Sequence, residues 1–207
     1  MPVDLATFAA PSHTAVLTME MQRGVIGDLA TMRELADAVA AHHVIDNTAR
    51  LLGSARSVGV RVVHCTAEFR ADKAGSKGNC PILAVALRSP DHLLVGSPSA
   101  EVVPELGPDP SDIICSRVHG MSPFAGTSLD QTLRNLGVTT VVATGVSVNI
   151  GVLGMVIEAV NLGYRVVIPT DCVAGVPDDY AESVMVNTLG LLAARTTSER
   201  LAATWAG

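Results

Sequence analysis

Short apolar runs rich in β-branched residues recur along the chain, and most are followed by a stretch whose apolar positions have helical spacing. This alternation predicts repeated β-α units and a parallel sheet. We expect strands at Thr14–Met19, Arg61–Thr66, Asp112–Ser116, Thr139–Thr144 and Arg165–Pro169, with a weaker sixth near Ala193–Thr196. Each run has the length of a strand and is too short to span a membrane.

The longest helical pattern extends from Thr31 to Ala55, with apolar side chains at intervals of three and four residues. Its stripe consists of Leu35, Val39, His42, Ile45, Ala49 and Leu52. We therefore expect one long helix, with His42 in the core or at an interface. Later helices are expected to begin near Thr127, Ile150 and Asp178.

Composition narrows the class of protein. The 207 residues are 48% hydrophobic and 3% aromatic, so aliphatic side chains must form the core of what we expect to be a single domain, residues 1–207. A formal net charge of −6 without a basic cluster argues against a nucleic-acid partner. The chain starts without the charged and apolar segments of an export signal, so we expect a cytoplasmic protein with no membrane association.

The four cysteines, at positions 65, 80, 115 and 172, form no CxxC motif and show no Cys/His spacing typical of a zinc site. Reduced, inert thiols are the expected state for Cys65, Cys115 and Cys172. His64 and Cys65 are adjacent on a predicted strand and should point to opposite faces of the sheet, which argues against a thiol–imidazole pair.

Four motifs occur in order along the chain. The first is an apolar strand that ends in Glu20-Met-Gln22, and the second is Arg117-Val-His-Gly-Met-Ser-Pro-Phe124-Ala-Gly-Thr. The third is the octapeptide 145–152, Gly-Val-Ser-Val-Asn-Ile-Gly-Val, and the fourth is 163–171, Gly-Tyr-Arg-Val-Val-Ile-Pro-Thr-Asp. Together they resemble the isochorismatase-like (cysteine hydrolase) family. This resemblance implies a three-layer α/β/α sandwich around a six-stranded parallel sheet of order 3-2-1-4-5-6, and a homodimer or homotetramer.

The family resemblance also implies a catalytic triad of Asp, Lys and Cys, but this chain carries Glu20, Arg117 and Gly151 at the matching positions. Glycine has no nucleophile, so a thioester route is unexpected here. Arginine can bind a carboxylate through two hydrogen bonds but cannot donate a proton near neutral pH. Glutamate keeps the carboxyl group one methylene further from the backbone and is expected to serve as the acid.

Further expectations follow from the same resemblance. Substrate contacts are expected from Gln22, His119, Phe124, Val146, Ser147 and Ile150. A cis peptide is implied near Val146–Ser147. We expect no cofactor, and no metal, because His64 and Asp72 do not reproduce the spacing of the family's metal-binding members. Lys73 and Lys77 lie in the loop 70–81, where one of them could replace the missing lysine, although a solvated loop is favoured.

Three functions remain open. The first is a hydrolase that acts on a small anionic or carbonyl metabolite without a covalent cysteine intermediate. True isochorismatases, which have glycine at this position and cleave a vinyl ether by protonation, are the precedent that the resemblance supplies. The second is a catalytically silent homologue that binds a metabolite or a partner subunit. The third is a cysteine hydrolase with a relocated thiol. An open pocket in which Glu20 faces Arg117 would favour the first, and a pocket filled by Met21, Met121 or Phe124 the second.

Overall fold

A twisted parallel sheet forms the centre of the molecule in the computed structural model, which describes residues 4–206. Its strands are β1 Thr14–Met19, β2 Arg61–Ala67, β3 Ile113–Arg117, β4 Thr140–Val146, β5 Arg165–Pro169, β6 Val173–Ala174 and β7 Ala194–Thr196. The order is β3-β2-β1-β4-β5-β7, and the short β6 pairs with β4. The predicted order is confirmed, with β7 as the sixth strand and β6 as an unpredicted addition.

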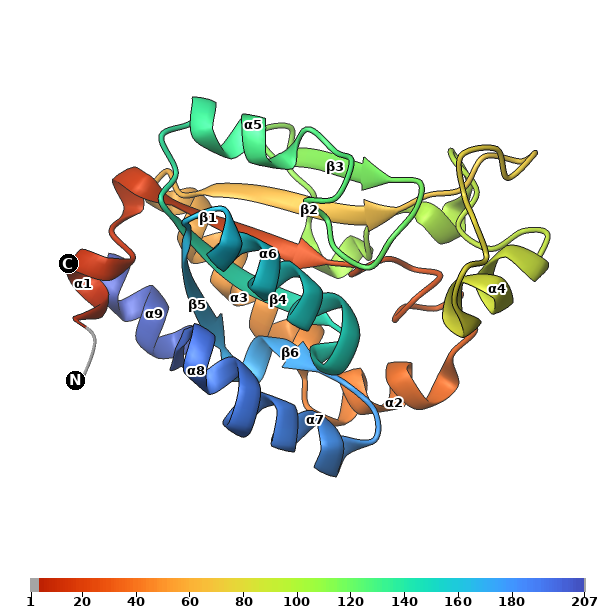
Figure 1. Ribbon diagram of the computed structural model, residues 1–207. Coiled ribbons are helices and arrows are strands. Elements are labelled where there is room, and N and C mark those ends of the chain that lie inside the picture. The colour runs from red at the N-terminus through yellow and green to blue at the C-terminus, as the bar shows by residue number, and fades with distance from the viewer. Residues whose placement is uncertain (1–3, 207) are drawn as a thin grey trace.

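Helices cover both faces of the sheet (Figure 1). They are α1 Leu5–Phe8, α2 Arg33–Ala41, α3 Val44–Ser57, α4 Pro81–Arg88, α5 Leu129–Asn135, α6 Leu153–Asn161, α7 Asp178–Val184, α8 Gly190–Leu192 and α9 Ser198–Trp205. Alternate residues of each strand face opposite layers: Val16 packs in the cluster with α3 and α9, whereas Leu17 packs in the cluster with α5 and α6. This arrangement confirms the three-layer sandwich.

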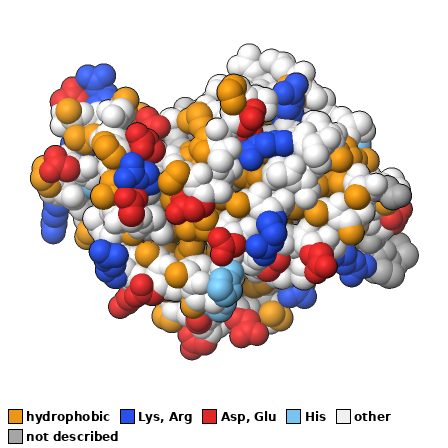
Figure 2. Space-filling view, turned by 180° about the vertical axis from the view of Figure 1, so that it is seen from behind, with side chains coloured by type: hydrophobic (Ala, Val, Ile, Leu, Met, Phe, Trp, Pro, Cys, Tyr) orange, Lys and Arg blue, Asp and Glu red, His pale blue; other side chains and the backbone are white. Residues whose placement is uncertain are grey.

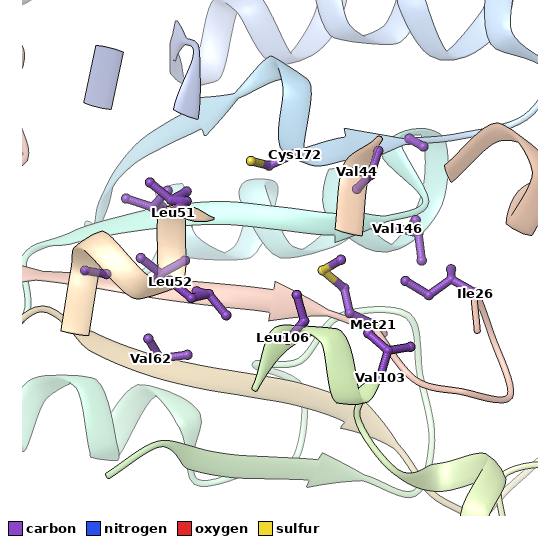
Figure 3. Close-up of a cluster of buried hydrophobic side chains, with 14 of the residues drawn as sticks. Met21, Ile26, Val44, Leu51, Leu52, Val62, Val103, Leu106, Val146 and Cys172 are labelled. Carbon is purple, nitrogen blue, oxygen red and sulfur yellow. The ribbon is translucent and has the colours of Figure 1, made fainter. Parts of the chain in front are cut away.

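Loops at the carboxyl ends of the strands are anchored in the core. Figure 3 shows Met21, which follows β1, beside Val103 and Leu106 from the segment before β3. All three are at most 1% exposed and belong to the cluster under α3. Because these loop residues are buried in the core, the loops hold the residues at the carboxyl ends of the strands in defined positions.

The predicted continuous helix from Thr31 to Ala55 is wrong, because the chain breaks into α2 and α3 at His42 and His43. His43 has a left-handed φ of 52°, which ends the helical hydrogen bonding of α2. The His42 side chain is 52% exposed and contacts Asp178 at 3.2 Å, so it is not a core residue. The buried face passes from Val39 to Val44 across the break, but the sequence also has Ile45 at helical spacing there, and periodicity alone therefore could not detect the break.

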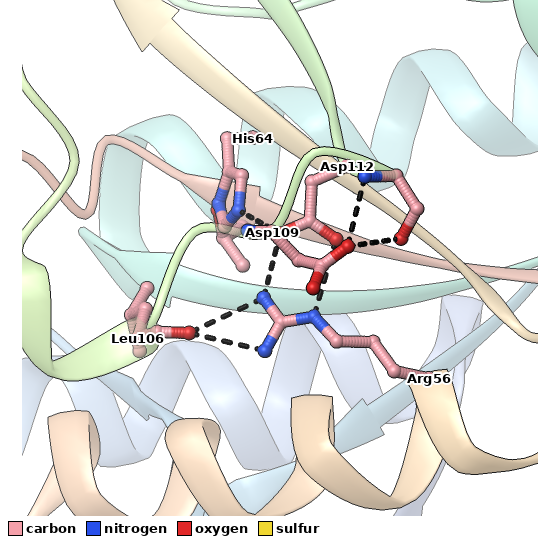
Figure 4. Close-up of polar contacts among 7 residues, drawn as sticks. Arg56, His64, Leu106, Asp109 and Asp112 are labelled. Atoms are coloured by element: carbon pink, nitrogen blue, oxygen red, sulfur yellow. Dashed lines mark hydrogen bonds and ion pairs between the residues drawn. The ribbon is translucent and has the colours of Figure 1, made fainter.

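A buried polar network, which the sequence did not predict, joins β1, β2 and α3 to the residue before β3 (Figure 4). His64 Nδ1 lies 2.8 Å from the Thr18 hydroxyl, and its Nε2 lies 3.1 Å from Asp112. Arg56 donates two hydrogen bonds to the Asp112 carboxylate, and the backbone N–H of Asp109 donates another. The polar groups of this network are thus satisfied within the protein.

The outer surface has mixed charge. Figure 2 shows acidic and basic side chains interspersed over one face, with no extended basic area there. Within residues 4–206, no helix combines the length and the apolar character needed to cross a membrane.

Candidate active site

A cavity of about 400 Å³ lies at the carboxyl ends of the central strands. In open α/β sheets this edge is where ligands bind. The polar side chains that line the cavity are Glu20, Arg117, His119, His92, Ser147, Asn149, Thr31 and Ser89. Its apolar wall is formed by Val25, Met32, Leu35, Phe69, Ile82, Leu83, Val85, Ala86, Leu93, Met121, Ile150 and Val176. Helices α2 and α4, which supply part of this apolar wall, lie beyond the strand ends in Figure 1.

Glu20 and Arg117 form an ion pair in the wall of this cavity. Glu20 directly follows β1 and adopts a left-handed φ of 51°, which is uncommon for a residue with a side chain. Its carboxylate is 23% exposed, while the Arg117 side chain is 4% exposed. The pair therefore joins a buried guanidinium to a carboxylate that remains open to the cavity.

Arg117 is held in place by the backbone around it. Its Nε donates to the carbonyl of Gly120 at 2.9 Å, and a terminal nitrogen lies 3.4 Å from the carbonyl of Thr66. The other terminal nitrogen of the guanidinium donates to Glu20. A fixed arginine of this kind orients the carboxylate beside it.

The segment after β4 brings Gly151 to the cavity. The Val146–Ser147 peptide is cis, as the resemblance implies. The turn of π-type helix at Val148–Val152 then leads directly into α6. A Cβ atom at Gly151 would lie 2.8 Å from the Val146 carbonyl oxygen and 3.0 Å from the end of the Met19 side chain. Glycine here therefore also permits close packing, and a cysteine would require this segment to shift.

The structure brings together six of the residues proposed from sequence: the cavity is lined by Glu20, Arg117, His119, Ser147, Ile150 and Gly151. Three others lie outside it. The buried Gln22 side chain bridges the backbone of Ala67 and Ala100. Phe124 stacks on Tyr164 with ring centroids 5.9 Å apart, and Val146 is buried in the core shown in Figure 3. We therefore propose no substrate contact for these three.

Two basic side chains lie beside Phe69; of these, His92 lines the cavity and Lys73 does not. His92 lines the wall, and its ring centroid lies 6.4 Å from that of Phe69. Lys73, for which a solvated position was favoured, instead has a buried Nζ 5.3 Å from the centroid of the Phe69 ring. Burial lowers the pKa of His92, and the nearby Lys73 ammonium lowers it further. The position of a long side chain on a turn-rich loop carries no periodic signal in the sequence.

The buried thiols are poorly suited to nucleophilic attack. Burial raises the pKa of Cys65 well above its usual range and raises that of Cys172 to about 12. Cys115 is also buried, while Cys80 is half-buried at the start of α4. None of the four lines the cavity. Within residues 4–206, no group of three His, Cys, Asp or Glu side chains is placed to hold a metal ion.

Comparison with known proteins agrees with these features. The model of the isochorismatase domain matches residues 14–200. This chain belongs to the isochorismatase family. The family assignment rests on most of the chain and includes both the strand that precedes Glu20 and the turn that contains Gly151.

Individual relatives are distant. The chain is 28% identical over 192 residues to the ureidoacrylate amidohydrolase RutB of Rhizobium rhizogenes, an alignment that covers 85% of this chain and 76% of that protein. It is 36% identical over 86 residues to the isochorismatase family protein YwoC of Bacillus subtilis, covering 42% of this chain and 45% of YwoC. The crystal structure of a cysteine hydrolase from Pseudomonas syringae superposes with a TM-score of 0.81 at 23% identity, covering 95% and 94% of the two chains, and supports the fold.

Proposed function

We propose that this isochorismatase-family protein hydrolyses a small anionic or carbonyl metabolite without a covalent cysteine intermediate. The observation that carries the proposal is the ion pair of Glu20 and Arg117, which stands in the wall of an open cavity beside Gly151. The relative RutB, whose name describes an amidohydrolase, supports hydrolysis as the reaction class. Of the three side chains that could have filled the site, Met21 and Phe124 pack elsewhere, and Met121 lines the wall of the open cavity.

The ion pair refines the role expected for Glu20. The Glu20 carboxylate accepts a hydrogen bond from the Arg117 guanidinium, and a carboxylate, which is an acceptor only, takes a proton rather than supplying one. We therefore assign Glu20 as the general base instead of the acid expected from sequence. Arg117 fixes the orientation of the Glu20 carboxylate, as hydrogen-bonding partners do for other catalytic acids and bases.

The reaction then needs no nucleophilic side chain. Glu20 takes a proton from water while the water oxygen bonds to the carbonyl carbon of the substrate. The proton passes from Glu20 to the leaving nitrogen or oxygen as the bond to that atom breaks. The turn at Ser147–Gly151 precedes α6 and borders the cavity. The Ile150 N–H donates to the Ser147 carbonyl, so the stabilisation of the developing oxyanion falls to the other backbone N–H groups of the turn.

A substrate screen followed by one matched pair of variants tests this proposal. Small amides, esters and vinyl ethers with a carboxylate are offered to the purified protein, and products are identified by mass spectrometry. Glu20→Gln should abolish any turnover found, whereas Glu68→Gln should keep it. Glu68 is a suitable control because its carboxylate accepts hydrogen bonds from Ser116 and Thr66 outside the cavity wall.

Two other outcomes would favour the alternatives. Binding of metabolites without turnover of any of them would favour the silent homologue. Turnover that is lost both on alkylation of the half-buried Cys80 and in Cys80→Ala would favour a relocated thiol. We also propose, from the family resemblance, a cytoplasmic homodimer or homotetramer of one-domain subunits, which light scattering would check for its oligomeric state.

A further inference from the structure

The cavity has an apolar wall that has no part in the proposed reaction. Glu20, Arg117 and Gly151 line the cavity at the strand ends, whereas α2 and α4 lie beyond those ends (Figure 1). Helix α4 contributes four apolar side chains to the lining, which are Ile82, Leu83, Val85 and Ala86. A substrate that fills the cavity with its carbonyl group at Glu20 therefore places its remaining atoms against this wall.

The inner part of the wall is fixed by the core. Phe69 and Leu93 are buried, and the backbone N–H of Phe69 donates to the Leu93 carbonyl at 2.7 Å. The Phe69 carbonyl in turn accepts from the N–H of Val95 at 2.9 Å. Leu35 of α2 and Leu83 of α4 are buried beside the same cavity. This apolar surface is therefore formed before any ligand binds.

The outer part of the wall exposes hydrocarbon to solvent. Met32, which precedes α2, is 49% exposed, and Ile82 and Val85 of α4 are 38% and 66% exposed. All three line the cavity. Exposed apolar side chains that gather at a cavity indicate a surface that binds a ligand or a partner. A hydrocarbon group in the cavity would cover them, and the gain in affinity grows with the apolar area removed from water.

The cavity supplies an anion with no free lysine or arginine. Among the described residues that line it, Arg117 is the one Lys or Arg side chain, and it is already paired with Glu20. Both lysines of the chain, Lys73 and Lys77, lie outside the lining. Burial lowers the pKa of His92, which favours its uncharged form. Because a carboxylate without a counter-ion is costly to bury, the cavity favours an uncharged ligand.

We propose that the substrate is an uncharged carbonyl compound with a hydrocarbon body, and that α2 and α4 bind this body. Calling the compound a substrate rests on the proposed function, and the proposal narrows its substrate class from anionic or carbonyl compounds to the latter. The cavity of about 400 Å³ is larger than the apolar cavity of about 150 Å³ that holds benzene in another protein. A ring or a chain of several carbons therefore fits beside the carbonyl group.

The test uses methyl ketones, which carry a carbonyl group and a hydrocarbon chain but no bond that hydrolysis can break. Protein NMR titrations at about pH 8, where an ordinary histidine is uncharged, measure Kd for the methyl ketones with ethyl, propyl, butyl and pentyl chains. Hexanoate, which combines the pentyl chain with a negative charge, is the matched anion. We expect affinity to rise about threefold per methylene, or about 30-fold across the series. Methyl pentyl ketone should bind at least about tenfold more tightly than hexanoate.

A double variant tests the role of α4. Ile82→Ser combined with Val85→Ser changes two exposed side chains, so the fold should be preserved, and a melting curve checks this. Affinity for methyl pentyl ketone should fall about tenfold, whereas affinity for methyl ethyl ketone should stay within about twofold of the wild-type value. The matched control is Val186→Ser, at a 48% exposed residue outside the lining, and it should bind the whole series as the wild type does.

Three binding results would overturn the proposal: affinity that does not rise with chain length, hexanoate that binds as tightly as methyl pentyl ketone, or a double variant that keeps the chain-length dependence. Dissociation of an oligomer by the double variant, seen by light scattering, would assign Ile82 and Val85 to a subunit contact and equally contradict it. Because the probes are not hydrolysed, the two proposals can fail separately. A flat series together with lost turnover in Glu20→Gln refutes the hydrocarbon site alone, whereas the expected series together with full turnover in Glu20→Gln refutes the proposed reaction alone.

Discussion

Asp112 and Glu20 are both paired with an arginine, and they differ in what else they contact. Asp112 is 2% exposed and accepts hydrogen bonds from Arg56, His64 and the backbone of Asp109. Glu20 is 23% exposed, accepts a side-chain hydrogen bond from Arg117, and borders the cavity. The first carboxylate is saturated within the protein, whereas the second retains acceptor capacity toward the cavity.

This difference separates a structural ion pair from a candidate catalytic one. Both pairs join a carboxylate to an arginine, so charge and pairing alone do not distinguish them. A carboxylate whose lone pairs are all occupied has no capacity for a water molecule or a substrate. The open carboxylate also occurs at the strand ends, where parallel sheets bind ligands, and substitutions at the two positions test this contrast.

The largest effect is expected on turnover. Glu20→Gln should lower kcat at least about 100-fold, the lower end of what a general acid–base group contributes. Asp112→Asn should leave kcat near the wild-type value at a temperature where both variants remain folded. Steady-state kinetics on a hit from the screen checks this. Equal losses in the two variants would remove the distinction between the carboxylates.

For the free energy of unfolding, Asp112→Asn should have the larger effect and Glu20→Gln the smaller one. Asp112→Asn removes the charge beside Arg56 and puts an NH2 donor among the groups that donate to this carboxylate, and it should lower the free energy of unfolding by about 3 kcal/mol, the lower end for breaking a buried pair. Glu20→Gln should cost less, because the amide oxygen can still accept from Arg117 at a partly exposed position. Urea denaturation measures both. A larger loss in Glu20→Gln than in Asp112→Asn would contradict the contrast.

A side chain at position 151 should disturb the turn beside the Glu20–Arg117 ion pair. Gly151→Ala forces its Cβ to within 2.8 Å of the Val146 carbonyl unless the segment moves. We expect a loss of about 2 kcal/mol in the free energy of unfolding, within the range for overpacked sites. The matched control is Gly53→Ala on α3, where a Cβ has no neighbour within 4 Å. Equal stability of the two variants would show that Gly151 is not required for packing.

The smallest expected effect is a change of stability with pH, and it arises from the buried polar network around His64 and Asp112. Burial lowers the pKa of His64 in the folded chain. Burial alone would raise the pKa of Asp112, but hydrogen bonds from Arg56, Asp109 and His64 hold it below its usual range. The unfolded chain therefore binds protons more readily at both groups, and stability should fall as pH falls, first below the ordinary histidine pKa of 6.5 and then through the carboxyl range.

His64→Gln should weaken the dependence of stability on pH near the ordinary histidine pKa. Urea denaturation at about pH 7 and about pH 5.5 would measure the slope. His92 contributes with the same sign, since its pKa is also lowered by burial, so some slope should persist in the variant. A wild-type stability that rises on acidification would contradict the expected direction of this pH dependence.

The centre of the sheet could be predicted from sequence because β1, β2, β4 and β5 are buried on both faces and appear as continuous apolar runs. Glu20 and Arg117 could be placed at the strand ends for the same reason. The sequence carries no comparable signal for the direction of a side chain that follows a strand. Gln22 and Phe124 were therefore predicted to line the site, although they point away from it. Lys73 and the His64 network depend on contacts between residues distant in sequence, which no local pattern encodes.

We propose that hydrolysis in this cavity proceeds without a covalent enzyme intermediate. Intact-protein mass spectrometry of the wild-type enzyme, quenched with acid during steady-state turnover, tests it most directly. We predict the unmodified protein mass at every time point while product accumulates. A protein mass increased by the acyl group of the substrate, rising and then decaying during turnover, would contradict the claim and restore a nucleophile to the site.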